Sequence, residues 1–526
     1  MKFLGKMFTI AGMAAALVSC SDKAVENENG DFRYLMDEFA DLKIMRYQVP
    51  GWDGLTLQQK EYVYHLAEAA KYGRDIIWMQ NCKYNLQIRK VLENILENYK
   101  GDRTCEEWAQ FETYAKRVFF SNGIHHHYAE DKFFPECSQE YFHALMAAVG
   151  EDDAALENLI FDPAAYPARK VMDGKDIVAE SAVNFYENVT RAEVEAFYAA
   201  MVDPSDKTPV SYGLNSRVVK GDDGVVREDV YKVGGLYGPA LEKICAELEK
   251  AAAVAENETQ KAYIADLVNY YRTGDLGLWD EYNIKWVNDT LGVVDFVNGF
   301  VEDYNDPLGR KATWEGLVNF KDAEASRRTE LISDNAQWFE DNSPVDKRFK
   351  KKEVKGVTAK VINVAALAGD CYPAAPIGIN LPNADWIRRE HGSKSVTIAN
   401  LTNAYNMAAQ ESPKNMLGEF AWSEDEIALE KKYGDLTNDL HTDLHECLGH
   451  GSGRLAPGVK GDELKNYGAT LEETRADLFA LYYMADQKMI DLGLIPSKEV
   501  AWAEYSKYIM NGIQTQLTRI QPGKNV

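Results

Sequence analysis

A chain of 526 residues is longer than one ordinary hydrophobic core can organise, so we expect two lobes or domains. Its content of 46% hydrophobic and 27% charged residues is typical of a soluble globular protein. The net charge of −25 argues against nucleic acid and anionic membrane surfaces as partners, because both require basic faces on the protein.

The first residues have the pattern of an export signal. Lysines precede an apolar run over residues 8–18, which is too short to cross a bilayer as a stable helix. The run ends in Leu-Val-Ser-Cys and resembles a bacterial lipobox, in which the cysteine, here Cys20, is lipidated and becomes the mature N-terminus. The alternative is an ordinary cleaved signal peptide. We expect a lipoprotein signal peptide over 1–20 and a polar tether over 21–31. The protein is then exported and touches the membrane only through its lipid anchor, on the periplasmic side or at the cell surface.

The segments after the tether change between helical and strand-like patterns. Apolar residues recur at helical spacing over 56–72. A period of two on either side of the turn at 221–224 predicts a β-hairpin. A long helical stretch is expected over 239–271, a strand over 357–367, and helices again from Glu424 onward. The chain is therefore predicted to be mixed α and β, with a helix-rich C-terminal part.

That C-terminal part contains the stretch HTDLHECLGHGSG, residues 441–453. His445 and His450 are five positions apart, and such positions lie about 140° apart around an α-helix, so they do not share a face. They can converge on one metal ion only if the helix takes up an extra residue in a π-type bulge, and we expect Gly449 to ease this distortion. His441 and His445 form a rival pair four positions apart, but no carboxylate follows His441. We prefer His445 and His450, with His441 as a surface residue or a neighbour of the ligands.

A catalytic zinc ion requires a third protein ligand and an open position for water. The helical stretch LEETRADLFALYY, residues 471–483, offers candidate carboxylates in Glu472, Glu473 and Asp477, with room for a return helix as in gluzincin-like sites. Glu446 directly follows a histidine and can therefore take a proton from the attacking water as a general base. Taken alone, the second stretch would be a solvated helix start; after HECLGH it is the candidate source of the third ligand.

HECLGH followed by EETRAD resembles the signature of the dipeptidyl peptidase III family, whose motifs are H-E-x-x-G-H and E-E-x-R-[AS]-[ED]. With one Zn²⁺ per chain, the resemblance implies zinc ligands at His445, His450 and Glu473. It also implies that Glu446 activates water, and that Glu472 and Asp477 hydrogen-bond the ligating histidines. Such partners fix the orientation of a ligating imidazole and raise its basicity.

Two further stretches, over 298–316 and 376–386, are similar to family segments that line the substrate cleft. The resemblance implies that the free ammonium of the substrate is held by Glu302, Glu315, Asn380 and Asn383. It implies that Tyr304 hydrogen-bonds the substrate near the scissile carbonyl. A carboxylate at a fixed distance from the zinc would measure two residues from the amine, and amides add acceptors for the remaining ammonium protons. The alternative for both stretches is turn chemistry, since proline beside Asn or Asp favours loops.

The fold class implied by the resemblance is α+β, with two lobes around a wide cleft. One lobe contains a five-stranded β-barrel core with helices, and we expect it over 32–322 and 364–409. The other is mostly helical and binds the zinc, and we expect it over 323–363 and 410–526. The sequence stops soon after the second motif, where family members continue, so the helical lobe is expected to be incomplete at its C-terminus.

These patterns and the resemblance predict a zinc-dependent dipeptidyl peptidase that releases dipeptides from the free N-terminus of short peptides. We expect a monomer whose partners are short peptides and not nucleic acid. One alternative is a non-catalytic zinc- and peptide-binding lipoprotein that lost its activity with its C-terminal part. A weaker alternative is an aminopeptidase that releases single residues.

Overall fold

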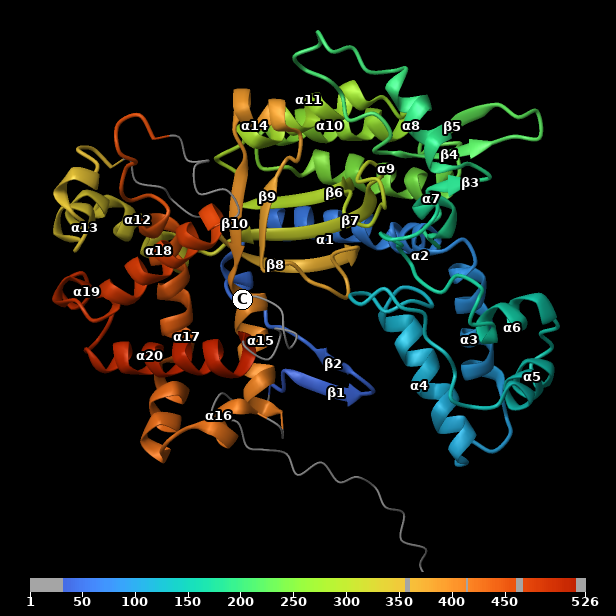
Figure 1. Cartoon of the computed structure of the whole chain (residues 1–526), viewed down its shortest axis with the longest axis horizontal. Coiled ribbons are helices and arrows are strands. Elements are labelled where there is room, and N and C mark those ends of the chain that lie inside the picture. The colour runs from blue at the N-terminus through green and yellow to red at the C-terminus, as the bar shows by residue number, and fades with distance from the viewer. Residues whose placement is uncertain (1–31, 355–359, 413–414, 460–466, 517–526) are drawn as a thin grey trace, which may run out of the picture.

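The computed structural model of the chain describes residues 32–354, 360–412, 415–459 and 467–516. The predicted signal peptide, the tether and the lipidation site Cys20 lie outside these residues. None of the described helices is both long enough and apolar enough to cross a membrane. The described chain combines helices and strands, as the sequence predicts (Figure 1).

Five strands form the central sheet (Figure 1). They are β6 (Val294–Glu302), β7 (Thr313–Lys321), β8 (Lys360–Gly369), β9 (Gly378–Leu381) and β10 (Lys394–Ile398). Strands β6, β7 and β8 form an antiparallel meander, β8 pairs in parallel with β10, and β10 pairs antiparallel with β9. The strand predicted over 357–367 corresponds to β8 from Lys360 onward, and residues 357–359 lie outside the described residues. A bulge between Phe300 and Glu302 places Glu302 opposite Thr313.

The predicted strands are present, but the expected closed barrel is not found. Within the described residues, β6 and β9 are the two edges of the sheet, and no ladder of backbone hydrogen bonds joins them. A barrel requires such pairing along both edges. Here α11 (Leu276–Asn288) borders the seam, and a side chain crosses it: Nδ2 of Asn383 donates to the carbonyl oxygen of Val301 at 3.3 Å. The sheet is therefore open in this structure.

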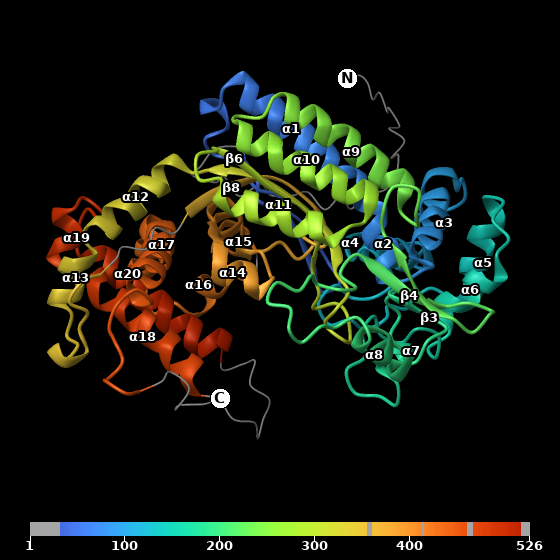
Figure 2. The same ribbon diagram turned by 90° about the horizontal axis from the view of Figure 1, so that it is seen from above.

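Helices cover one side of the sheet (Figure 2). They include α1 (Leu57–Tyr72), α9 (Gly238–Ala253) and α10 (Glu258–Thr273). Helix α1 packs on β6, β7 and β8, and α9 packs on α1. The helix predicted over 56–72 is confirmed as α1, which begins after a capping box at Thr56. The helical stretch predicted over 239–271 is two helices, because the side chain of Asn257 caps a new N-terminus there.

A group of helices near the N-terminus has its own hydrophobic core, which includes Ile95, Phe111 and Phe142. Its members are α2 (Arg74–Asn81), α3 (Asn85–Asn98), α4 (Glu106–Phe120), α5 (Gln139–Ala148) and α6 (Ala154–Phe161). A separate hairpin lies at the start of the described chain, with strands β1 (Leu35–Phe39) and β2 (Leu42–Met45).

A three-stranded sheet contains the predicted hairpin. Its elements are β3 (Tyr186–Glu187), β4 (Ser216–Lys220) and β5 (Val226–Val230), flanked by α7 (Ile177–Glu180) and α8 (Arg191–Ala199). Strands β4 and β5 pair antiparallel around the turn at 221–224, where the N–H of Gly224 donates to the carbonyl oxygen of Gly221 at 2.9 Å. The hairpin prediction is confirmed.

The helices that carry the two motifs lie beside the central sheet and have a core of their own (Figure 2). We use the name motif-bearing helices for the whole group around this core, although only α18 and the end of α17 with the turn after it carry the motifs. Its members are α12 (Ala323–Asp334), α13 (Ala336–Asn342), α17 (Glu424–Leu444), α18 (Tyr467–Met484), α19 (Gln487–Asp491) and α20 (Glu499–Met510). Helix α15 (Ala399–Glu411) lies between them and the sheet, in contact with α17 and β8. Helix α14 (Asp385–His391) packs on α11, and α16 (Met416–Phe420) follows α15. Helix α17 begins at Glu424, where the sequence predicts the return to helices. The lobe boundaries implied by the resemblance stay a prediction.

Candidate metal centre

A π-helical turn, η3 (His445–Gly449), follows directly on α17. The backbone N–H of His450 donates to the carbonyl oxygen of His445 at 3.0 Å, a bond that spans five residues instead of the four of an α-helix. The extra residue turns the two histidines to the same side. Their ring centroids are 4.7 Å apart, with an angle of 85° between the ring planes. The π-type bulge predicted from the spacing is therefore confirmed.

Gly449 allows η3 and α18 to approach each other closely. A Cβ atom at this position would lie 2.7 Å from Cα and 2.8 Å from Cβ of Ala476 on α18. Contacts this short do not occur between real side chains and a backbone, so any larger residue would push the two helices apart. The sequence suggested that this glycine eases the distorted turn; the structure gives it a second task, which is to let the second motif reach the first.

Glu473 on α18 faces both imidazoles. Its Oε2 lies 3.2 Å from Nε2 of His445 and 3.7 Å from Nε2 of His450. Atoms bound tetrahedrally to one zinc ion at about 2.0–2.1 Å stand about 3.3 Å apart, so both distances suit a shared divalent ion. The Glu473 side chain is 62% exposed, which leaves one side of the group open, as a catalytic metal requires. The structure thus brings the three implied ligands together. His445 and His450 also belong, with Glu446, to a group that could hold a metal ion.

The other nitrogen of each imidazole also has a carboxylate partner. Nδ1 of His450 lies 3.0 Å from Oε1 of Glu472, and Nδ1 of His445 lies 2.7 Å from Oδ1 of Asp477. Both carboxylates are therefore where the resemblance implies. Each can accept a hydrogen bond from Nδ1–H, which leaves the Nε2 lone pairs directed toward Glu473.

Arg475 extends this arrangement, although the sequence argument gave it no role. Its Nε and Nη2 donate to Glu472 at 3.0 and 2.6 Å, and its Nη1 donates to Oγ of Ser452 at 2.7 Å. The hydrogen bond from Arg475 lowers the pKa of Glu472 to about 2, against the opposing effect of burial. Glu472 is therefore a fixed negative charge behind His450. The signal was present in the sequence, because Arg475 is the arginine of EETRAD.

Glu446 lies on the solvent side of the π turn, whereas Cys447 and Leu448 are buried in the core of the motif-bearing helices. A carboxylate oxygen of Glu446 and ligand nitrogens of His445 and His450 all lie within 4.8 Å of one another. A group placed in this way can reach a water molecule at the open side of the site.

His441 is not beside Glu473 but behind the site, where its Nε2 lies 3.2 Å from Oδ1 of Asp477. Tyr508 on α20 contacts the same carboxylate. Burial alone would raise the pKa of Asp477, but hydrogen bonds from Tyr508, His441 and His445 lower it below its usual value. Sequence reasoning missed Tyr508, since it belongs to neither motif and no local pattern marks it.

The residues expected to hold the substrate ammonium form a separate group at one end of the central sheet. We call this group, which consists of Glu302, Glu315, Asn380 and Asn383, the predicted ammonium site. Nδ2 of Asn383 donates to Glu302 at 3.1 Å, so these two are in contact. Glu315 is 6% exposed, and its Oε2 lies 3.6 Å from Sγ of Cys371. Asn380 is exposed, and its carbonyl oxygen accepts a hydrogen bond from Arg388.

Burial raises the pKa of both glutamates in this group. For Glu315 the neighbouring charges of Glu302 and Asp370 raise it further, well above the usual range of a carboxyl group. For Glu302 the hydrogen bond from Asn383 opposes the effect of burial, and the pKa remains raised. Three carboxyl groups thus gather here without a cation among their hydrogen-bond partners in the described residues. This is an electrostatic setting that favours a positively charged ligand.

Tyr304 is 57% exposed, and its backbone carbonyl accepts a hydrogen bond from Lys170. Within the described residues, no hydrogen bond or ion pair joins Tyr304 or the predicted ammonium site to the histidine site. The structure therefore forms two distinct groups, one on the motif-bearing helices and one on the sheet.

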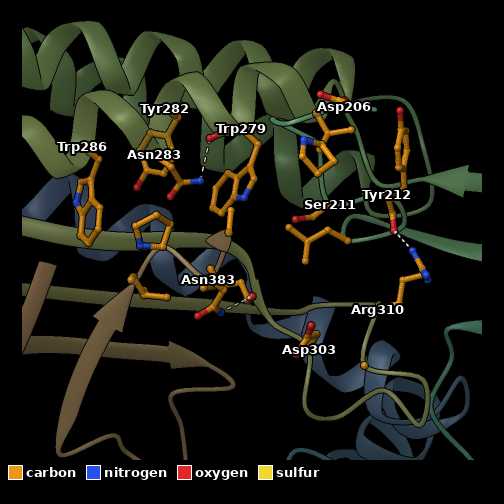
Figure 3. Close-up of a pocket in the computed structure, with 18 of the residues that line it drawn as sticks. Asp206, Ser211, Tyr212, Trp279, Tyr282, Asn283, Trp286, Asp303, Arg310 and Asn383 are labelled. Carbon is orange, nitrogen blue, oxygen red and sulfur yellow. Dashed lines mark hydrogen bonds between the residues drawn. The ribbon is translucent and has the colours of Figure 1, made fainter. Parts of the chain in front are cut away.

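A pocket of about 420 Å³ opens at the seam of the sheet, beside the predicted ammonium site (Figure 3). Trp279, Tyr282 and Trp286 of α11 form its aromatic wall, and Asp303 and Asn383 lie on its opposite side. The absence of a side chain at Gly299 on β6 lets Trp279 pack directly on the strand, since a Cβ there would lie 2.6 Å from the indole. The sequence argument did not find this pocket, because its walls come from four distant segments.

The chain is similar to known proteins in sequence and in fold. The model of peptidase family M49 matches residues 214–462. Dipeptidyl peptidase 3 of Dictyostelium discoideum is 24% identical over 502 residues, which cover 83% of this chain and 70% of that protein. Dipeptidyl peptidase 3 of Homo sapiens is 25% identical over 453 residues, which cover 76% of this chain and 59% of that protein. The chain thus spans less than two thirds of the human relative.

Two solved structures share the fold. Dipeptidyl peptidase III from Caldithrix abyssi superposes with a TM-score of 0.62 and 21% sequence identity, covering 88% of this chain and 76% of that chain. The enzyme from Corallococcus sp. strain EGB superposes with a TM-score of 0.54 and 19% identity over the same shares of the two chains. The family model and the relatives together support the assignment of this chain to the dipeptidyl peptidase III family, peptidase family M49, and the solved structures show that it shares their fold.

Proposed function

We propose that the protein is a zinc-dependent dipeptidyl peptidase that releases dipeptides from the free N-terminus of short peptides, with one Zn²⁺ per chain. The observation that carries this proposal is the convergence of the two Nε2 atoms of His445 and His450 on Oε2 of Glu473. Nitrogen and carboxylate donors at this spacing suit zinc. When bound, the ion polarises a peptide carbonyl and acidifies water.

Each protein group at this centre then has a specific task. His445, His450 and Glu473 would hold the ion, with Nδ1 of each imidazole fixed by Asp477 or Glu472. The exposed carboxylate of Glu446 would accept the proton of the attacking water and return it to the departing amine. Its neighbourhood to both imidazoles supports this role.

The predicted ammonium site on the sheet would select substrates with a free N-terminus. Glu302 and Glu315 supply negative charge, and the amides of Asn380 and Asn383 supply acceptors for the remaining ammonium protons. The exposed hydroxyl of Tyr304 would hydrogen-bond the peptide near the scissile carbonyl. Since this group and the histidine site stand on different parts of the fold, an extended peptide would bridge them. A fixed span between the two would measure the length of the released product.

The proposal is tested by mass spectrometry of the products. The full chain, loaded with zinc, is incubated with a short peptide and, as control, with the N-acetylated form of the same peptide. We expect dipeptides from the free peptide and no cleavage of the acetylated one. Single residues would favour the ordinary aminopeptidase. Bound zinc and bound peptide without any cleavage would favour the non-catalytic binding protein.

The raised pKa values of the two glutamates in the predicted ammonium site predict a pH-dependent affinity for peptides. Below its raised pKa each glutamate is neutral and attracts an ammonium only weakly, so the affinity is expected to rise with pH in the range above the ordinary pKa of a glutamate. It should fall again when the peptide amine loses its proton, at about pH 7.7–8.0. Calorimetric titration of a peptide into the Glu446→Ala variant measures this without turnover.

Glu302→Gln is the matched control for that titration, because the amide keeps the shape of the side chain and cannot ionise. We expect weaker binding and a flatter acidic limb than in the parent variant. An unchanged acidic limb in Glu302→Gln would assign the pH dependence to other groups. A parent affinity that does not rise with pH on the acidic side of the pKa of the peptide amine would contradict the prediction.

We also propose that the protein is an exported, monomeric lipoprotein, held at the membrane through Cys20. The apolar run that ends in Leu-Val-Ser-Cys supports this. Replacing Cys20 by serine is expected to move the expressed protein from the detergent phase to the aqueous phase in a Triton X-114 partition. A wild-type protein that already enters the aqueous phase would instead fit a cleaved signal peptide without a lipid.

A further inference from the structure

Asp477 stands between the candidate metal centre and helix α20. Its Oδ1 lies 2.7 Å from Nδ1 of His445 and 3.2 Å from Nε2 of His441, and its Oδ2 accepts a hydrogen bond from the hydroxyl of Tyr508 at 2.6 Å. One carboxylate thus serves a candidate ligand and two residues outside both motifs. With both of its oxygens engaged, it can take only one orientation toward His445.

Helix α20 contributes a second contact one turn away from Tyr508. Oε1 of Glu504 lies 2.8 Å from Nδ1 of His441, and Glu504 is buried. The ring of His441 also stacks on Tyr508, with centroids 5.5 Å apart and an angle of 22° between the planes. Residues 504 and 508 are four positions apart and share one face of the helix. Helix α20 therefore presents a two-residue clamp, Glu504 and Tyr508, to His441 and Asp477.

The second half of α20 depends on polar contacts of this kind. In the first half of α20 the side chains of Val500, Ala501 and Ala503 are buried, whereas no residue from 505 to 510 is fully buried. Besides Tyr508, the second half is held by the hydroxyl of Tyr505, which donates to the carbonyl oxygen of Leu481 at 2.9 Å, and by Lys507. Few buried apolar contacts mean that this half can open locally at low cost.

We propose that Tyr508, with Glu504 and His441, positions the zinc ligand His445 through Asp477, so that zinc affinity and the docking of the second half of α20 are linked. The inference rests on the proposed zinc site. The linkage follows because the same Asp477 orientation is required by both contacts. Whatever stabilises the contact of Asp477 with His445 also stabilises its contact with Tyr508. Thermodynamic linkage makes this effect reciprocal.

The test compares two tyrosine variants on the same helix. Tyr508→Phe removes the hydroxyl that reaches Asp477, and Tyr505→Phe removes one that reaches only a backbone carbonyl on α18. Zinc affinity of the full chain is measured by competition with a chromophoric chelator. We expect Tyr508→Phe to bind zinc about 10–100-fold more weakly, the usual effect of losing such an outer partner, and Tyr505→Phe to bind it like the wild type.

Amide hydrogen exchange over residues 505–510 supplies a readout that is independent of activity. Added zinc is expected to slow exchange there in the wild type and in Tyr505→Phe, and to have little effect in Tyr508→Phe. The visible absorption of the Co²⁺-loaded protein should change in Tyr508→Phe alone, because the orientation of His445 is altered.

The outcomes separate this inference from the proposed function. Wild-type protein that binds no zinc removes the proposed function itself. Wild-type protein that binds zinc, with an unchanged affinity in Tyr508→Phe, overturns only the linkage. Equal losses in both tyrosine variants would also overturn it, because docking of α20 in general would then matter rather than the contact to Asp477. If Tyr508→Phe does not fold, Glu504→Gln takes its place: a several-fold loss of affinity supports the linkage, and wild-type affinity rejects it.

Discussion

Replacing Glu446 by alanine is expected to lower kcat/KM for an Arg-Arg-naphthylamide by about 10²–10⁴-fold, the range assigned to a positioned general base. Zinc content should remain at one ion per chain, because Glu446 is not among the three side chains that converge on the proposed ion. The loss corresponds to about 3–5 kcal/mol of transition-state stabilisation. Release of the fluorescent naphthylamine and metal analysis of the same preparation measure both quantities.

Glu424→Ala is the matched control, since Glu424 is an exposed glutamate at the start of α17, the helix that leads directly into η3. It should keep wild-type activity and zinc content. Full activity in Glu446→Ala would remove this residue from the mechanism. Loss of zinc together with activity would show that Glu446 acts as a ligand rather than as a base.

Gly449→Ala is expected to weaken both zinc binding and folding stability. The new methyl group would stand 2.7–2.9 Å from the backbone and Cβ of Ala476, so η3 and α18 must separate. Overpacking of this kind costs about 1–3 kcal/mol. The shift also moves Glu473 away from the histidines, and we expect a zinc affinity at least about tenfold lower, as a 1.4 kcal/mol loss would give. Thermal unfolding of the zinc-free chain and chelator competition measure the two effects.

Gly54→Ala is the control for that substitution, because a Cβ at Gly54 meets no atom within 4 Å. Adding Ala476→Gly to Gly449→Ala removes one of the three close contacts and should restore part of the affinity. A single Gly449→Ala variant with wild-type zinc affinity would mean that the helices do not depend on this approach, and that the glycine serves only the π turn.

The local features of the site could be predicted from the sequence, because they depend on spacing along one helix. Two histidines five positions apart cannot converge without an inserted residue, and the π turn at His445–Gly449 follows from that requirement. The identity of the third ligand needed the family resemblance, since spacing alone left Glu472, Glu473 and Asp477 as candidates. The structure separates them by distance: Glu473 faces the Nε2 atoms, and the other two face the Nδ1 atoms.

Features that depend on the approach of distant segments could not be predicted. The contact between Gly449 and Ala476 joins two motifs, and neither motif shows how close their helices come. Tyr508 reaches Asp477 from a helix without any motif. The closed barrel came from the resemblance alone, and whether a sheet closes depends on its two edge strands. Here one edge, β9, is four residues long, and an amide side chain crosses the seam in place of a backbone ladder.

The aromatic wall at that seam gives the protein an optical signal of its own. Trp279 and Trp286 line the pocket beside the predicted ammonium site, and both indoles face the volume that an occupant would fill (Figure 3). The two residues are only 8% and 5% exposed, so a peptide entering there would cover the small part of each that still faces the pocket, and a change in their emission would report occupancy without any label.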